Sequence, residues 1–533
     1  MQDKKAKIRK LAAQCVFQRL SLEEFLSDKS YKENILQLVS MGVGGFCIFK
    51  GDFASAKKVI DALQKQSLIP LLFSADFENG LTMRFSDGTS FPHAYALGKC
   101  NDETITMQVA EAIAKEAKAI GVNWNFAPVC DINSNPLNPI INIRAFGEND
   151  DIVSKHANAY ISGTQSQNVI ACAKHFPGHG DTETDSHLVL PVLNFDVERI
   201  RNLELKPFES AFRNGVKSVM VGHLAVPSFD KSGLPASLSY EITTNLLRKE
   251  MGFDGLIVTD ALDMNAITKL YPSGEAAVKA LEAGADVLLL PANPFEAITR
   301  LIESAMNDTN ILNRLEESSK RILEHKHWCG LIKSIRKAED FINGVQTQEL
   351  KPGELFKKND DEPFNSEKHE KLALKAAFRA IEIHGDKELI PLPEKNSILG
   401  FAVLQGEDIQ PPTLFFKYLA QSIDNNCEFG FIDENISNEE LNVLIKDTSK
   451  NEIVLLAFFY RARAYQGSVG ASDRLIEIVN KIKNNRPTVC ILFGNPYLEE
   501  SLSADTFMLP YSDSTPSIAA SIMYLSGRTL PTE

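Results

Sequence analysis

Short apolar runs alternate with longer amphipathic stretches over the first half of the chain. The runs read as continuous hydrophobic segments, which is typical of parallel strands buried on both faces. The stretches between them have the spacing of surface helices, for example at 105–120, 197–214 and 241–251. The predicted strands are 45–49, 69–75, 123–128, 169–174, 216–222, 256–259 and 286–290. Repeated strand–helix units of this length predict a TIM-like (β/α) barrel, with its eighth strand missing or degenerate in the sequence.

A second strand–helix series follows a polar stretch. Residues 346–368 contain Lys351-Pro-Gly and a run of charged side chains, and they are typical of a solvated linker. After a helix near 367–380, apolar runs recur at 380–383, 398–404, 453–459, 489–493 and 507–509. They predict a smaller α/β sandwich domain of the doubly wound kind. The expected organisation is a barrel over 1–345, a linker over 346–368 and a C-terminal domain over 369–533.

Charge and composition exclude several classes of partner. The formal net charge of −14 argues against nucleic acid or an anionic membrane. No stretch approaches the roughly 18 apolar residues of a membrane-spanning helix, and the basic N-terminal segment lacks the apolar run of a signal peptide. The 8 cysteines are scattered without a CxxC motif, which suits free thiols in a reducing compartment. We therefore expect a cytoplasmic protein, of an oligomeric state that the sequence does not set.

The densest group of titratable side chains lies in residues 174–187, Lys-His-Phe-Pro-Gly-His-Gly-Asp-Thr-Glu-Thr-Asp-Ser-His. Proline and glycine make a regular element through its middle unfavourable, and loops with this many titratable groups usually bind or catalyse. Asp185 and His187 are two residues apart, so both side chains can lie on one side of an extended or turning backbone. The carboxylate can then fix the imidazole tautomer and raise its basicity, which makes the pair a candidate proton shuttle.

A metal site is the alternative interpretation of the same segment, because histidine and aspartate are common ligands of zinc and iron. Pro177 and Gly178 interrupt the helical spacing that would bring His175 and His179 together as ligands. We therefore expect no metal and no cofactor. His179, between two glycines, is better explained as a residue that braces the loop.

A nucleophile for acid–base chemistry is available further along the chain. Asp260 directly follows the apolar run 256–259, so its carboxylate should project into the mouth of the barrel. Asp263 should fall in the first turn of the next helix, where an acidic side chain favours the positive end of the helix dipole, so we interpret it as structural. A carboxylate nucleophile with a separate proton shuttle is the logic of retaining glycoside hydrolysis.

Other polar side chains also lie where the predicted strands end. Since these ends converge on one face of a barrel, they are candidates for substrate binding, although each alone could be a helix cap. Asp76 can accept two sugar hydroxyls, while the loop residues Arg84 and Arg144 can donate to hydroxyl or carbonyl oxygens or serve in structural ion pairs. The remaining strand-end residues are Asp131, Lys174, His175 and His223.

Residues 1–340 resemble glycoside hydrolase family 3, and specifically its β-N-acetylglucosaminidase branch. The resemblance is carried by Asp76-Phe-Glu-Asn-Gly with Arg84-Phe, Ala127-Pro-Val-Cys-Asp-Ile-Asn, Arg144-Ala-Phe-Gly, the whole of 174–187 and Val258-Thr-Asp-Ala-Leu. It implies a retaining exo-hydrolase that removes terminal β-linked N-acetylglucosamine, often from peptidoglycan fragments, without metal or cofactor. The expected partner is thus a small carbohydrate.

The resemblance also implies roles for individual residues. Asp260 is the expected nucleophile, and His187 is the expected general acid/base, oriented by Asp185. The residues expected around the sugar are Asp76, Arg84, Arg144, Lys174 and His175.

One departure and two alternatives remain. The family usually has Glu-Gly-Gly-Arg after the strand-end aspartate, whereas residues 78–81 here are Glu-Asn-Gly-Leu, which changes contacts beyond the sugar rather than the chemistry. A deprotonated imidazole carries no negative charge, so phosphate could replace water as the acceptor, and an N-acetylglucosaminide phosphorylase is one alternative. A β-glucosidase of the same family is the other.

Overall fold

The chain folds into two compact units. The structure, a computed structural model, describes residues 2–182, 190–345, 350–357, 366–393, 396–404, 409–423, 426–448, 450–461, 470–483 and 486–530. The first unit comprises 1–89, 106–132 and 148–366, and the second comprises 90–105, 133–147 and 367–533. Two segments from the first half of the chain thus pack with the C-terminal residues. The linear boundaries at 346–368 stay a prediction.

The first unit is a parallel barrel, which confirms the predicted fold class. Within its described residues, eight parallel strands neighbour one another in the order β7-β6-β5-β4-β3-β2-β1-β8. The ring closes between β7 and β8, where Val258 bridges Val287 and Asp286 N donates to Ile257 O over 2.8 Å. The strands are β1 (Val16–Leu20), β2 (Gly45–Ile48), β3 (Leu72–Ala75), β4 (Trp124–Asn125), β5 (Ile170–Phe176), β6 (Ser218–Val221), β7 (Leu256–Thr259) and β8 (Leu288–Leu289).

The strand that the sequence pattern misses is β1. It follows α1 (Gln2–Gln14) after a single residue, and polar Gln18 and Arg19 interrupt its apolar run. It nevertheless pairs with both neighbours, placing Phe17 opposite Gly45 and Val16 opposite Leu288. The local pattern of these residues resembles a continuation of the preceding helix. Pairing with strands on both sides therefore determines that they form a strand.

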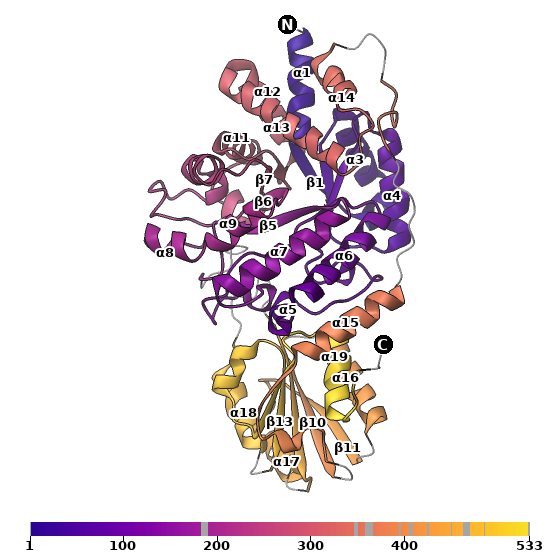
Figure 1. Cartoon of the computed structure of the whole chain (residues 1–533), viewed down its shortest axis with the longest axis vertical. Coiled ribbons are helices and arrows are strands. Elements are labelled where there is room, and N and C mark those ends of the chain that lie inside the picture. The colour runs from indigo at the N-terminus through magenta and orange to yellow at the C-terminus, as the bar shows by residue number, and fades with distance from the viewer. Residues whose placement is uncertain are drawn as a thin grey trace. The chain divides into compact units, whose positions relative to one another are not determined.

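Helices return the chain between consecutive barrel strands, as Figure 1 shows for the part coloured indigo to pink. They include α2 (Leu22–Ser27), α3 (Lys29–Met41), α4 (Phe53–Gln66), α6 (Glu103–Ala119), α7 (Asp150–Ser166) and α11 (Ser273–Ala283), while α12 (Pro294–Asn307) and α13 (Thr309–Trp328) follow the last barrel strand. The single helix predicted at 197–214 is wrong. The chain forms α8 (Val197–Asn202) and α9 (Lys206–Arg213), and Pro207 lies in the first turn of α9, where its missing N–H costs nothing. The helix predicted at 241–251 is a π-helix, η4 (Glu241–Glu250).

The second unit is a doubly wound α/β sandwich, as predicted. Its described strands form a sheet in the order β11-β10-β12-β13-β14-β9, parallel except for the edge strand β9. They are β9 (Glu382–Gly385), β10 (Ser397–Leu404), β11 (Asn426–Ile432), β12 (Ile453–Tyr460), β13 (Thr488–Gly494) and β14 (Thr506–Leu509). The pattern misses β11, because Glu428 and Gly430 interrupt its apolar residues.

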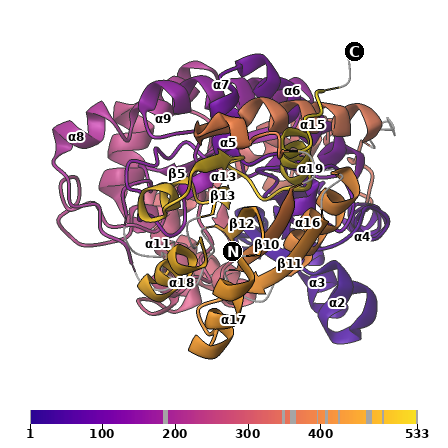
Figure 2. The ribbon, with the colours of Figure 1, turned by 90° about the horizontal axis from the view of Figure 1, so that it is seen from below.

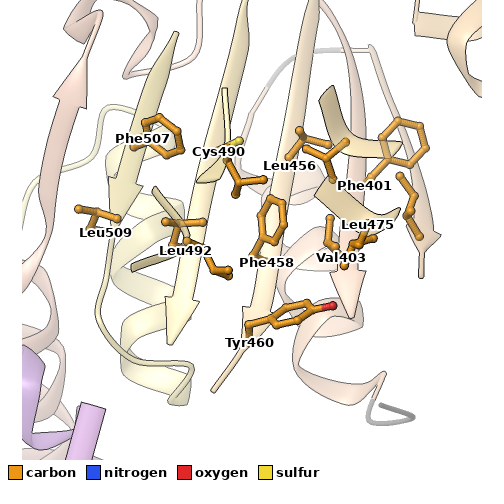
Figure 3. Close-up of a cluster of buried hydrophobic side chains, with 14 of the residues drawn as sticks. Phe401, Val403, Leu456, Phe458, Tyr460, Leu475, Cys490, Leu492, Phe507 and Leu509 are labelled. Atoms are coloured by element: carbon orange, nitrogen blue, oxygen red, sulfur yellow. The ribbon is translucent and has the colours of Figure 1, made fainter. Parts of the chain in front are cut away.

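Alternate side chains of this sheet enter two separate cores. Leu456 and Phe458 of β12 pack with Leu475, which lies on α18 (Asp473–Lys483) (Figure 3). Leu455 and Phe459 belong to the opposite core, with residues of α15 (Ser366–Ala380), α16 (Gln410–Ser422) and α19 (Thr515–Leu525). Figure 2 gives a second view of these helices beside the sheet. Successive side chains of β12 point to opposite faces of the sheet, and each face is therefore covered by its own layer of helices.

In the described parts of both units, no helix combines the length and the apolar character needed to cross a membrane.

Candidate functional site

Several of the predicted site residues lie at the carboxyl ends of barrel strands. Asp76 follows β3 directly, Asp260 follows β7 directly, and Lys174 and His175 occupy the last part of β5. In parallel barrels these ends form the face that carries active sites. The barrel therefore brings together side chains that are far apart in the sequence.

Four charged side chains form a compact cluster on this face. The Lys174 ammonium lies 2.8 Å from Asp76 Oδ1 and 2.8 Å from Glu78 Oε1. Arg84 Nη2 donates to the other oxygen of Asp76 over 2.6 Å. The Lys174 side chain is only 2% exposed, and that of Asp76 is 16% exposed. Two cations and two carboxylates thus compensate one another in a site that remains open beside Asp76.

The cluster keeps Asp76 ionised. Burial alone would raise the pKa of this carboxyl, but Lys174 and Arg84 outweigh that effect and hold the pKa at about 2. The same contacts leave donors free for a ligand. Arg84 Nε is buried and has no hydrogen-bond partner among the described residues, and a sugar hydroxyl could accept from it. The cluster can therefore both accept from and donate to a neutral polyol.

His175 is oriented by a buried carboxylate, Asp131. Its Nδ1 lies 2.7 Å from Asp131 Oδ2, and its backbone N–H donates to the same carboxylate over 3.1 Å. Burial raises the pKa of Asp131, but the neighbouring His175 more than offsets this and lowers it overall. An ionised Asp131 favours the tautomer with the proton on Nδ1, leaving Nε2 as the acceptor. The sequence pattern placed Asp131 at a strand end without giving it this role.

The first part of the loop, residues 176–182, is tightly built. His179 N–H donates to Asp131 over 2.7 Å, and His179 Nδ1 lies 2.7 Å from Thr182 Oγ1. Burial lowers the pKa of His179 to about 4, while the charges of Asp131 and Asp260 act in the opposite direction. A Cβ at Gly180 would lie 1.7 Å from Ile132 O, so only glycine fits there. His179 is therefore uncharged at neutral pH, and its hydrogen bonds hold the loop in place.

The loop is also anchored from outside. Arg199, on α8, donates through Nη2 to Asp181 over 2.8 Å and to Glu204 over 3.1 Å. The predicted proton-shuttle residues Asp185 and His187 lie outside the described residues, in 183–189. Among the residues that the structure describes, no group of three or more His, Cys, Asp or Glu side chains could hold a metal ion.

The turn that carries Asp260 is held by backbone contacts. Asp260 N donates to Val221 O over 2.9 Å, and Asp260 Oδ1 accepts from Ala261 N over 2.8 Å. His223, which follows β6, contacts Ala261 O through Nε2 at 2.9 Å. The carboxylate is partly exposed, as a nucleophile must be.

Asp263 has a different environment from Asp260. It lies before α10 (Asn265–Thr268) rather than in its first turn, and its Oδ2 accepts from Arg19 Nη2 over 2.9 Å. Arg19 also lies over the Phe49 ring, 4.1 Å from its centroid. Asp263 is thus engaged in an exposed ion pair, in line with a structural role.

Arg144 belongs to the second unit. It ends the short helix η2 (Asn142–Arg144), and its Nη1 donates to Ile140 O over 3.1 Å. In the same segment, Asn142 N–H donates to Asn133 Oδ1, and Asn142 Nδ2 donates to Asn495 Oδ1. Its expected role in sugar binding stays a prediction.

Comparison with known proteins shows the family to which the chain belongs. Residues 6–325 match the glycosyl hydrolase family 3 N-terminal domain. The chain belongs to glycosyl hydrolase family 3. The curated relative Beta-hexosaminidase A of Pseudoalteromonas piscicida is 34% identical over 309 residues, which are 52% of this chain and 52% of the relative. The chain spans about half the length of the first curated relatives it matches, 52% and 57%.

Two solved structures resemble the whole chain. A family 3 beta-N-acetylglucosaminidase from Paenibacillus sp. str. FPU-7 is 27% identical, with a TM-score of 0.81 and 98% of each chain covered. A beta-glucoside phosphorylase, BglX, is 25% identical, with a TM-score of 0.81, and the match covers 98% of this chain and 91% of the other. The family 3 architecture thus extends over both units.

Replacing Lys174 by methionine should destabilise the protein in a pH-dependent way. The variant leaves Asp76 and Glu78 buried without their shared cation, and breaking a buried ion pair costs about 3–5 kcal/mol. In the wild type the pKa of Asp76 falls from 3.8 to about 2, so its stabilisation is present above pH 3.8 and is lost as the pH falls through about 2. The deficit in urea-unfolding free energy should therefore be largest at neutral pH and shrink below pH 4.

Lys155→Met is the matched control, since Lys155 pairs with Asp151 on the surface of α7, with 53% and 68% of the side chains exposed. Such a pair contributes roughly 0–1 kcal/mol, so the control should stay close to the wild type. A Lys174→Met deficit that is small, or independent of pH, would contradict the electrostatic account of the cluster.

Proposed function

We propose that this family 3 protein is a retaining exo-β-N-acetylglucosaminidase. The observation that carries the proposal is the pairing of two features at the strand ends: a partly exposed Asp260 directly after β7, and the buried cluster around Asp76. The first suits a nucleophile and the second suits a neutral sugar. The names of the Pseudoalteromonas relative and of the Paenibacillus structure support the same activity.

The proposed reaction has two steps. Asp260 attacks the anomeric carbon while His187 donates a proton to the departing oxygen, which breaks the glycosidic bond and leaves the sugar covalently on Asp260. His187 then takes a proton from water, and the water oxygen displaces Asp260. Asp185 would keep the His187 tautomer fixed and stabilise its protonated form.

The proposed sugar site uses the described cluster. Asp76 would accept from sugar hydroxyls, while Lys174 and Arg84 would donate to them, and His175 would present the ring that Asp131 orients. Arg144 joins this set on the strength of the family motif Arg144-Ala-Phe-Gly. We propose terminal N-acetylglucosamine of peptidoglycan fragments as the substrate and the cytoplasm as the location.

Phosphorolysis is the second candidate. It is favoured by the 0.81 TM-score with a beta-glucoside phosphorylase across 98% of this chain. An uncharged His187 would let an anionic acceptor approach the glycosyl-enzyme, where a second carboxylate would repel it. Because that phosphorylase is named for β-glucosides, a β-glucoside is the alternative substrate.

Release of p-nitrophenol from the N-acetyl-β-glucosaminide and the β-glucoside, with and without phosphate, should separate these candidates. We expect a higher kcat/KM for the N-acetylglucosaminide, with free N-acetylglucosamine as the product in both buffers. Formation of a sugar 1-phosphate would assign phosphorolysis. A preference for the glucoside would contradict the proposed substrate.

Asp260→Asn should abolish turnover while the protein stays folded, because the amide oxygen is a far weaker nucleophile than the carboxylate. A loss in kcat on the order of 10⁴-fold is expected for an essential nucleophile. Asp263→Asn is the matched control, since Asp263 lies three residues further on and pairs with Arg19. Both are measured with the chromogenic N-acetylglucosaminide. Retained activity in Asp260→Asn, or an equal loss in both variants, would refute the assignment.

His187→Ala should slow substrates in proportion to how much protonation their leaving group needs. A general acid contributes about 10²- to 10⁴-fold, so an alkyl or sugar leaving group should suffer a loss of that size. A dinitrophenyl leaving group departs without a proton, and its first step should hardly change. The measurement is single-turnover release from both substrates. Equal slowing of the two would rule out the acid role.

A further inference from the structure

The backbone of Phe77, between Asp76 and Glu78, is held by two buried side chains from other elements. Asn125, which closes β4, accepts from Phe77 N–H through Oδ1 over 2.9 Å and donates through Nδ2 to Phe77 O over 3.2 Å. The Tyr160 hydroxyl, on α7, donates to the same carbonyl over 2.7 Å. It also accepts from Asn125 Nδ2 over 3.2 Å. The backbone N–H and C=O of Phe77 are therefore both held by side chains that lie outside the turn.

The hydrogen bonds of Asn125 and Tyr160 to the Phe77 backbone are shielded from solvent. Asn125 and Phe77 are 0% exposed, and Tyr160 is 1% exposed. The Phe77 ring packs edge-on against Phe85, with 5.6 Å between centroids, and Phe85 directly follows Arg84. The apolar contact thus links the turn that carries Asp76 and Glu78 to the residue beside Arg84. Buried hydrogen bonds of this kind cannot be exchanged for bonds to water, so the turn has one favoured geometry.

The geometry matters because Phe77 separates the two carboxylates that share one cation. Asp76 and Glu78 both lie 2.8 Å from the Lys174 ammonium, and they reach it from either side of Phe77. A rotation of the Phe77 backbone would shift one carboxylate relative to the other and break this shared contact. Asp76 must also keep its second oxygen on Arg84. Few orientations of the turn satisfy all three contacts.

We propose that Asn125 and Tyr160 are positioning residues for the sugar site, which hold the turn so that Asp76 presents its carboxylate to the sugar hydroxyls. The inference rests on the proposed function, since it takes Asp76 as a sugar ligand. Neither residue touches the substrate, because both are buried behind the turn. They act through Asp76 and Glu78.

The Tyr160 hydroxyl is suited to this role at any working pH. Burial raises the pKa of Tyr160 well above its ordinary value of 10.0, and the charge of Glu78 acts in the same direction. The hydroxyl therefore keeps its proton and remains a donor.

A double-mutant cycle between Tyr160→Phe and Asp76→Asn tests the inference. Two quantities are measured for the wild type, both single variants and the double variant: kcat/KM for the chromogenic N-acetylglucosaminide, and the calorimetric Kd of N-acetylglucosamine. Tyr160→Phe should lose up to about tenfold in both quantities, the size expected for one buried hydrogen bond. In the Asp76→Asn background the same change should cost less than about twofold, because the group being positioned is gone.

Tyr460→Phe is the matched control. The Tyr460 hydroxyl donates to a backbone carbonyl, Leu404 O, over 3.1 Å, and the residue is 6% exposed. This variant should stay within about twofold of the wild type in kcat/KM. Melting curves establish that each variant is folded, and Asn125→Ser replaces Tyr160→Phe in the cycle if the latter does not fold.

Three results would overturn the inference. No loss in Tyr160→Phe, or an equal loss in both backgrounds, would mean that Tyr160 does not act through Asp76. Wild-type values in Asp76→Asn would instead remove Asp76 from the sugar site, so the proposed binding set and the inference would fail together. A large loss in Asp76→Asn with additive behaviour would overturn the inference alone.

Discussion

The contact between the Lys174 ammonium and the carboxylates of Asp76 and Glu78 is the constraint on which the candidate site depends. A lysine side chain that is 2% exposed is stable only if its charge is compensated, and two carboxylates in the same place need a cation for the same reason. The barrel meets both demands by ending β3 and β5 on one face. Removing any member would leave an uncompensated buried charge, so the cluster behaves as one unit. Its geometry is consequently fixed before any ligand arrives, which reduces the cost of ordering on binding.

The fold could be predicted wherever a segment's own pattern determines its structure. Strands buried on both faces of the barrel appear in the sequence as apolar runs, and β7 was predicted with its observed bounds. The two strands that escaped prediction, β1 and β11, contain polar residues or glycine and are determined by pairing with their neighbours. The break between α8 and α9 escaped for a related reason, because the amphipathic pattern continues across it while the helix does not. The local sequence pattern therefore predicts the apolar buried strands better than it predicts the edge strand β11, the first strand β1 or the ends of helices.

The candidate site was predictable in its charged residues and not in the residues that hold them. Strand-end position singled out Asp76, Lys174 and Asp260, because polar residues directly after apolar strands are conspicuous. Asn125 and Tyr160 carry no such mark. A tyrosine on a wall helix is most simply a core residue, and its hydroxyl has meaning only once Phe77 O is found beside it. Glu78 stands in the predicted motif, two residues after Asp76, and this spacing was the available sign that it could share a partner. Supporting residues come from distant segments, so their roles depend on the tertiary structure.

Charge balance in the cluster bears on the choice between water and phosphate. The cations of Lys174 and Arg84 are committed to Asp76 and Glu78, so the cluster is close to neutral and offers little attraction to an anion. On the proposed mechanism, the sugar site therefore suits a neutral sugar equally well whether water or phosphate then attacks the glycosyl-enzyme. The acceptor must approach the face of the sugar served by His187, and a phosphate would need donors or cations there that the cluster does not provide. On the proposed mechanism, sugar recognition and acceptor choice would thus be separate properties of the protein, the first set by the buried cluster and the second by the surroundings of His187.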